Sequence, residues 1–274
     1  MAFKSSPSPE RIPFNAEIGQ KRGTGQDNTV YQLVNSAEKP HLRQPTGLVV
    51  KINHDNAADH RIRYADDRMA AEKGLQYKKN KYDILKAFLG DFVPETFFVL
   101  GQVRAKGSSF RYAEYTLQQE VPRVSLSDLT ADQRGSDALK GNVLNLMASL
   151  QRMYRILGEV NARTAQGVTL DGKLDLGGVS DYVLSEDLDD GLRHEFTDED
   201  AKQIINSNKS PNLLVDPESL NLYCIDFDQG QWYPGMDEAK QKALDLLARE
   251  TTAGMQIGSV AVAENFTQQS FIFK

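Results

Sequence analysis

The sequence predicts an α+β fold in which a strand-rich first half precedes a mostly helical second half. An alternating segment, Thr29 to Val34, and a compact apolar run, Gly47 to Ile52, both have the composition of β-strands. Later, residues Ser136 to Thr164 carry apolar side chains at steps of three and four, which is the spacing of one helical face. Strands followed by helices form the α+β pattern.

The other elements of the first half follow from local composition. Residues 55–81 are highly charged and compatible with a helix, and Tyr82 to Leu89 gives a second helical pattern. Two more strands, Val93 to Leu100 and Phe110 to Val121, are predicted on either side of the turn at Gly107. The first half is therefore expected to run as hairpin, helix or helices, and hairpin.

The long helix of the second half is expected to form its core. Its apolar stripe consists of Leu139, Val143, Leu146, Leu150, Met153 and Leu157, and we expect Met147 to be buried with it. Residues 166–190 are rich in glycine and aspartate and predict a loop around a short strand. Thr197 with Asp200 three residues later predicts the start of a helix, and a last helix is expected over Asp237 to Glu250.

Composition excludes several classes of protein. The net charge of −6 disfavours a general nucleic-acid-binding role. The single cysteine, Cys224, excludes an internal disulfide framework and a cysteine-rich zinc site, and its apolar surroundings predict a core residue rather than a reactive thiol. No apolar run is long enough for a membrane span, and the N-terminus lacks the apolar segment of a secretory signal. We expect a cytoplasmic protein, with export by a route that needs no cleaved signal as the alternative.

A hairpin near the end of the chain has polar residues at its ends. The strands Leu213 to Val215 and Leu222 to Ile225 are joined by a proline-containing polar turn. Asn212 precedes the first strand, and Asp226 and Asp228 follow the second. Oxygen ligands at neighbouring strand ends are what Mg²⁺ requires. The alternative is a surface hairpin with ordinary polar ends.

The first pair of strands carries two parts of a phosphate cradle. Gly23 and Gly25 allow backbone N–H groups to approach an anion. Lys51 lies within the apolar strand Gly47 to Ile52, where an ammonium is costly to bury unless it meets a negative charge.

These motifs together resemble those of the protein-kinase-like superfamily. Gly23-x-Gly25-x-x-Asn28-x-Val30-Tyr31, followed by Val49-Val50-Lys51, is similar to the glycine-rich loop and strand lysine of that family, with Asn28 in place of the third glycine. Asn212 and the sequence Ile225-Asp226-Phe227-Asp228 resemble its metal-binding residues. The IDFD sequence is closer to small-molecule and lipopolysaccharide-sugar kinases than to eukaryotic protein kinases.

The resemblance implies a bilobal fold and an ATP site. It implies a β-rich lobe over residues 14–121 and a minimal, mostly helical lobe over 122–274. Before them, the Ser- and Pro-rich residues 1–13 predict a flexible arm. Gly23, Gly25 and Asn28 would cover the phosphates of ATP, and Lys51 would contact them. Glu72 would orient Lys51, although Asp66 and Asp67 are also available and Glu72 could be a solvated helical charge. Residues 119–122, which include Glu120, would bind the adenine through backbone groups.

The resemblance also implies which residues hold Mg²⁺ and act in catalysis. Asn212 and Asp226 would bind Mg²⁺, with Asp228 as a second support. Lys209 would face the transferred phosphate, or is a solvated loop lysine. The family's catalytic aspartate falls at Ser207, which is too weak a base without a partner. Asp198, Glu199 or Asp200 could replace it only if the preceding helix or loop folds back.

Three functions are therefore open. The first is a Mg·ATP-dependent phosphotransferase that lacks the usual catalytic aspartate, with an AMP-transferring enzyme as a variant. The second is a pseudokinase that binds nucleotide or acts as a scaffold, which Ser207 favours. The third is an unrelated α+β interaction protein in which Lys51 and Asp226 form structural ion pairs. The acceptor, a small molecule or a protein, is not indicated.

Overall fold

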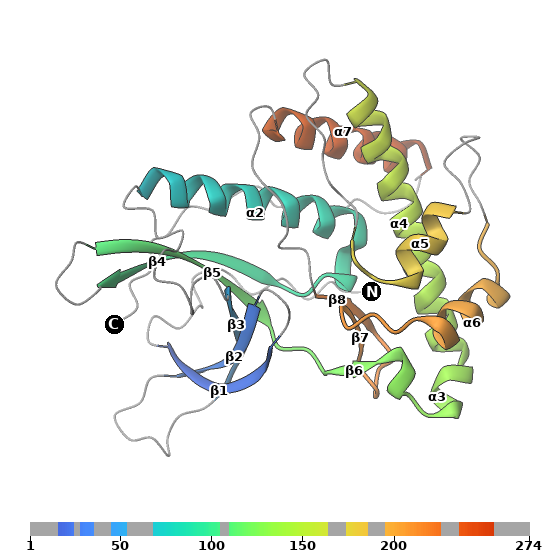
Figure 1. The fold of residues 1–274 in the computed structure, drawn as a ribbon. Coiled ribbons are helices and arrows are strands. Elements are labelled where there is room, and N and C mark those ends of the chain that lie inside the picture. The colour runs from blue at the N-terminus through green and yellow to red at the C-terminus, as the bar shows by residue number, and fades with distance from the viewer. Residues whose placement is uncertain are drawn as a thin grey trace. The chain divides into compact units, whose positions relative to one another are not determined.

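The computed structural model describes most of the chain: residues 16–24, 28–35, 45–53, 68–104, 110–163, 174–185, 195–225 and 236–254. The described elements, drawn in Figure 1, group into two compact units. The first unit contains strands β1 to β5 and helix α2 as far as Leu75. The second contains α2 from Gln76, the segment up to Glu95, and the described chain from Val121 to Gly254. The expected arm at residues 1–13 lies outside the described residues.

The first unit is built on a five-stranded antiparallel sheet in the order β1-β2-β3-β5-β4. Its strands are β1 (Ala16–Thr24), β2 (Asn28–Asn35), β3 (Pro45–Asn53), β4 (Thr96–Arg104) and β5 (Phe110–Gln119). Helix α2 (Arg68–Leu89) separates β3 from β4 in the chain. The described elements of this part of the chain thus run as strands, a helix and a hairpin, in the order that the sequence predicts.

The two faces of this sheet differ in polarity. Because side chains alternate along a strand, Leu33, Val50 and Leu117 share one face, and they form an apolar cluster with Val99. The other face carries Lys51 together with buried polar side chains: Gln32, Thr116 and Gln118. Gln118 Nε2 donates a hydrogen bond to Thr96 Oγ1 at 3.2 Å, which satisfies one of these buried groups. The sheet therefore packs an apolar core on one side and a polar interior on the other.

The second unit is mostly helical and includes a small sheet. After α2 come η3 (Gly90–Phe92), β6 (Val124–Ser125), η4 (Leu126–Asp128) and α3 (Ala131–Gly135). The longer elements that follow are α4 (Asp137–Arg163), α5 (Gly178–Ser185), α6 (Asp198–Ser207), β7 (Leu213–Val215), β8 (Leu222–Cys224) and α7 (Met236–Gly254). Strands β6, β7 and β8 form an antiparallel sheet in that order.

Helix α4 is the centre of the second unit. It contacts α3, α5, α6 and α7, which surround it in Figure 1. All six residues of the predicted stripe are buried, as is Met147. Helix α6 begins at Thr197, whose side chain and that of Asp200 form the predicted capping box. The core of this unit is thus correctly predicted from helical spacing.

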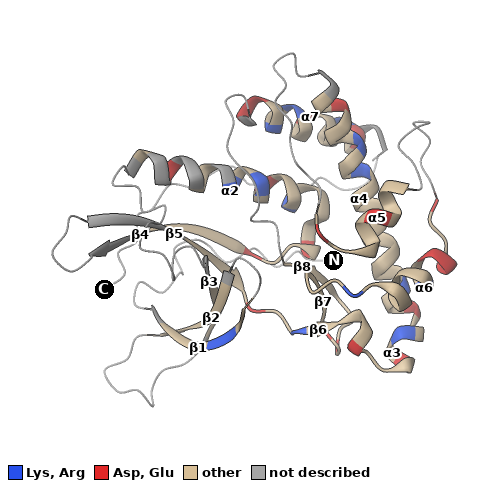
Figure 2. Cartoon of the chain, viewed as in Figure 1, with Lys and Arg blue, Asp and Glu red and all other residues tan. Residues whose placement is uncertain are grey.

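The charged residues of the surface alternate in sign on α7. Figure 2 shows both positively and negatively charged residues along this helix. Lys242 Nζ lies 2.8 Å from Glu238 Oε1, and Lys240 Nζ lies 2.6 Å from Asp83 Oδ2 on α2. This mixed pattern is typical of a solvated helix face. None of the described helices is long and apolar enough to cross a bilayer.

The predicted hairpin is present, and its turn is held by the helices. Leu213 pairs with Cys224 and Val215 with Leu222. Asn142 Nδ2 of α4 donates to the Leu220 carbonyl oxygen at 2.8 Å, and Gln133 Nε2 of α3 donates to that of Pro217 at 2.8 Å. Leu220 has a φ of 58°, a strained conformation for a non-glycine residue, which these two bonds help to maintain. The hairpin is therefore fixed within the second unit.

One expected element differs from the sequence prediction, and one open alternative is decided. Residues 68–89 form a single helix, where the sequence left open one helix or more. Residues 178–185 form helix α5, where a loop around a short strand was expected. The sequence also predicts a strand or a docked extension at the tail that ends in residues 270–274, and this tail lies outside the described residues.

Cys224 is expected to be unreactive in the native protein. It is fully buried on β8, and desolvation of the thiolate raises the pKa of its thiol to about 12. Because the thiolate is the nucleophile, its fraction at pH 8 falls roughly 1,000-fold below that of an ordinary cysteine. A disulfide reagent should thus modify the native protein at least about 1,000-fold more slowly than the urea-unfolded protein. Rates within about tenfold of each other would contradict this account of burial.

Candidate functional site

A row of paired residues crosses the sheet at Lys51. Gly23 on β1 pairs with Val30 on β2, Val30 pairs with Lys51 on β3, and Lys51 pairs with Thr116 on β5. Directly paired residues in antiparallel strands project to the same face. The Lys51 side chain is only 9 % exposed and thus lies on the polar face of the sheet, in register with the first glycine of the predicted loop.

Other parts of the predicted phosphate cradle are described less fully. Asn28 begins β2 and pairs with Asn53, while Gly25 lies outside the described residues. Glu72, on the first turns of α2, belongs to the same unit as Lys51 and is half-buried. Asp66 and Asp67, the alternatives to Glu72, lie outside the described residues.

Glu120, at the end of β5, makes contacts within the first unit. Its backbone N–H donates to the Gly47 carbonyl oxygen at 2.9 Å. Its carboxylate accepts a hydrogen bond from Gln32 Nε2 at 3.2 Å and lies 2.8 Å from Arg22 Nε, as an ion pair whose angle is too bent for a hydrogen bond. The Glu120 side chain and N–H are therefore engaged, which leaves its carbonyl oxygen as the group able to face an adenine.

The loop before β7 is fixed through Asn212. Its side-chain Nδ2 donates to the Asp175 carbonyl oxygen at 3.0 Å. Its own carbonyl oxygen accepts a hydrogen bond from Ile225 N–H at 3.0 Å. The hydrogen bond from Nδ2 orients the amide. Its oxygen, Oδ1, is the acceptor atom of the side chain and is the kind of atom that a hard cation binds. Ile225 directly precedes Asp226 in the sequence, so the hydrogen bond joins Asn212 to the strand end that leads to the predicted metal ligand.

Asp226 and Asp228 lie outside the described residues. Among the described residues, no group of three or more His, Cys, Asp or Glu side chains is arranged to hold a metal ion. Of the predicted metal ligands, only Asn212 is thus described.

Ser207 and Lys209 are exposed on either side of a buried asparagine. Ser207 is the last residue of α6, and Lys209 lies in the loop after it. Asn208 is 3 % exposed; its Oδ1 accepts from Ser210 N–H at 2.8 Å, and its Nδ2 has no hydrogen-bond partner. The backbone at Gly177 passes close to the Asn208 side chain, because a Cβ on Gly177 would lie 3.0 Å from Asn208 Oδ1. Gly177 also has a φ of 58°, so only glycine fits there without strain.

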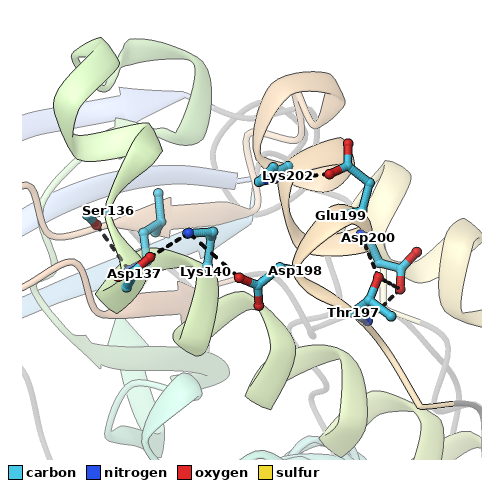
Figure 3. Close-up of polar contacts among 9 residues, drawn as sticks. Ser136, Asp137, Lys140, Thr197, Asp198, Glu199, Asp200 and Lys202 are labelled. Atoms are coloured by element: carbon cyan, nitrogen blue, oxygen red, sulfur yellow. Dashed lines mark hydrogen bonds and ion pairs between the residues drawn. The ribbon is translucent and has the colours of Figure 1, made fainter.

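The three acids considered as substitutes for the catalytic aspartate have other partners. Figure 3 shows them at the start of α6. Asp198 lies 3.8 Å from Lys140 of α4, Glu199 pairs with Lys202 at 3.0 Å, and Asp200 caps the helix and accepts from Tyr182 OH at 2.6 Å. They lie at the opposite end of α6 from Ser207, about 10–13 Å along the helix axis. Helix α6 does not fold back, so these acids do not replace the aspartate.

Asp175 is the acid that sequence reasoning missed. Its carbonyl oxygen accepts hydrogen bonds from Ser210 Oγ at 3.2 Å and from Asn212 Nδ2 at 3.0 Å. Its side chain is exposed. The backbone of Asp175 is thus fixed beside the loop that contains Lys209 and Asn212, and its exposed carboxyl belongs to the same residue. Its place in a glycine- and aspartate-rich stretch, 35 and 37 residues upstream of Ser210 and Asn212, gave no signal of this contact.

The comparisons with known proteins add no relative. No protein-family model matches the sequence, and a search of curated proteins finds no significant match.

Proposed function

We propose that this chain is a Mg·ATP-binding protein with a protein-kinase-like fold and the activity of an atypical phosphotransferase. The observation that carries the proposal is the burial of Lys51 on the polar face of the sheet, in register with Gly23. A buried ammonium favours an anionic ligand. The order of the described strands, helix and hairpin in this part of the chain also agrees with the small lobe that the motifs imply.

The residues that would hold the nucleotide are those that the motifs imply. Gly23, Gly25 and Asn28 would cover the phosphates, and Lys51, oriented by Glu72, would bind them. The carbonyl oxygen of Glu120 would accept a hydrogen bond from the adenine. Asn212 Oδ1 and the carboxylates of Asp226 and Asp228 would bind Mg²⁺, an oxygen set that suits this cation. Bound Mg·ATP would supply the transferred group.

The base of the reaction is assigned to a different residue from that of the family. Ser207 cannot replace an aspartate, whereas Asp175 has an exposed carboxyl and its backbone is held next to the Lys209–Asn212 loop. A pseudokinase remains the second candidate function, and the observation that favours it is Ser207 itself. AMP transfer is distinguished from phosphoryl transfer by which phosphate of ATP reaches the acceptor.

A thermal-shift titration of the full chain with Mg·ATP tests binding. At 100-fold excess over the dissociation constant, a ligand that binds the native state alone raises its stability by about 2.7 kcal/mol. For a chain of this size, that corresponds to roughly 5–10 °C in melting temperature. Transfer of label from γ- or α-labelled ATP then separates kinase, AMP-transferase and non-enzyme. Absence of any shift at millimolar Mg·ATP would remove both the phosphotransferase and the nucleotide-binding pseudokinase.

Asp175→Asn is expected to lower label transfer from ATP by about 100-fold or more, because the amide cannot accept the proton of the acceptor. Binding of Mg·ATP should be unchanged, since the backbone carbonyl that holds Ser210 and Asn212 is retained. Asp198→Asn is the matched control and should leave transfer unchanged. Equal transfer rates in wild type and Asp175→Asn would refute the assignment of the base.

A further inference from the structure

A cavity of about 810 Å³ lies against the outer face of α4, opposite the helix's buried stripe. Ser149, Arg152 and Arg155 line it from α4 at three-residue steps, and Glu195 and Phe196, just before α6, line it from the other side. All of these residues belong to the second unit. Neither Lys51 nor Asn212 is among its lining residues, so the cavity is distinct from the proposed nucleotide site.

The two arginines in the cavity differ in their partners. Arg155 Nη2 forms an ion pair with Glu250 of α7, at 2.5 Å from Oε1. Arg152 forms no ion pair with any described residue, and its Nε is completely covered and has no hydrogen-bond partner. A covered donor without an acceptor destabilises the protein. Because Nε is covered, an incoming acceptor would reach the Arg152 guanidinium at its Nη atoms. Unlike Arg155, Arg152 has no ion-pair partner among the described residues to compete with that acceptor.

The rest of the lining indicates the kind of ligand. Ala148 and Phe196 provide apolar surface, while Ser149 and Gln151 provide further polar groups. A cavity of this volume is within the range of small-molecule sites. Arginine binds carboxylates and phosphates through paired N–H groups. The exposed carboxylate of Glu195 in the same lining disfavours a doubly charged ligand, which favours a carboxylate over a phosphate dianion.

We propose that this cavity binds a small monocarboxylic acid with an apolar body, and that Arg152 recognises the carboxylate. Arg155 and Glu250, already paired, hold α4 against α7 and shape the cavity. The apolar body would lie against Ala148 and Phe196.

Calorimetric titration of the full chain with sodium phenylacetate tests this site. We expect saturable binding with a dissociation constant on the order of 1 mM, which is typical of so small a ligand. Phenylacetamide, which has the same shape without the charge, should not bind measurably. Arg152→Gln should weaken phenylacetate binding by about tenfold or more. Arg249→Gln, which removes an exposed arginine of α7 outside the cavity lining, is the matched control and should bind as wild type does.

A second variant keeps the test decisive if Arg152→Gln is poorly folded. Ala148 is exposed on α4, so Ala148→Trp should fold normally while filling the cavity, and it should also abolish phenylacetate binding. The proposal is overturned if wild type shows no saturable binding, if phenylacetamide binds equally well, or if a folded Arg152→Gln or Ala148→Trp variant binds like wild type.

Discussion

Lys51→Met is expected to weaken Mg·ATP binding by roughly 10- to 100-fold, because one charge-assisted contact to the phosphates contributes about 1.5–3 kcal/mol. Methionine has nearly the length of lysine and is apolar, so it should be accommodated at this buried position of β3. The dissociation constant of the variant, measured by calorimetry alongside its unfolding midpoint in urea, checks the expectation.

Lys21→Met provides the control for this experiment. Lys21 is an exposed residue of β1, so the variant has the same change in charge without the change at the polar face of the sheet. Its affinity for Mg·ATP should equal that of wild type. If Lys51 were a structural ion-pair residue instead, Lys51→Met would lower the stability of the protein and wild type would show no ATP binding to lose.

Leu150→Ala is expected to lower the free energy of unfolding of the second unit by about 2–5 kcal/mol. Leu150 is completely buried on α4, the helix that contacts α3, α5, α6 and α7. The substitution removes three buried carbons, Cγ and the two Cδ methyl groups. It leaves a cavity that could be filled only if the helices around α4 moved. Urea unfolding followed by circular dichroism measures the change.

The same helix provides the comparison. Asn145 is exposed on α4, and Asn145→Ala should change the free energy of unfolding by no more than about 0.5 kcal/mol. Reactivity of the Cys224 thiol gives an independent measure, because the buried thiol reacts only when the unit opens. A loss of under 1 kcal/mol in Leu150→Ala would contradict the central place of α4 in this core.

The elements predicted well are those whose pattern is repeated over many residues. The apolar stripe of α4 continues through its whole length, and every residue of the stripe is buried. Thr197 and Asp200 predict a helix start by local chemistry alone, and the capping box is present. In these cases local sequence and tertiary packing favour the same structure.

Elements that depend on tertiary contacts were missed. Helix α5 starts at two glycines and has weak helical propensity, but Val179 and Val183 are buried, and Tyr154 OH of α4 donates to Ser180 Oγ at 3.1 Å.

Strand β1 was not expected, because Gly19 and Gly23 are poor strand formers and its pairing with β2 has two irregularities. A Cβ at Gly19 would lie 2.9 Å from the Val34 side chain, so the glycine permits the close approach of β2.

The candidate site was predictable where it follows strand register and unpredictable where it depends on distant contacts. The segments Thr29 to Val34 and Gly47 to Ile52 predict two neighbouring strands, which are β2 and β3. The observed register places Gly23, on the unexpected strand β1, in one row with Lys51 on β3. Asp175 contacts Asn212 across 37 residues, through a backbone carbonyl that any residue type would provide. The contact that supports Asn212 could therefore not be predicted from the sequence.

Calorimetric titration of the full chain with Mg·ATP, repeated with ATP in EDTA and with Asp226→Ala, tests the proposed function most directly. We expect one saturable binding event per chain, weakened by removal of Mg²⁺ and by Asp226→Ala, which takes away the carboxylate assigned to the metal. Heat without saturation in wild type, or saturable binding that is unchanged both in EDTA and in Asp226→Ala, would contradict the proposal that this chain binds Mg·ATP through Asn212 and Asp226.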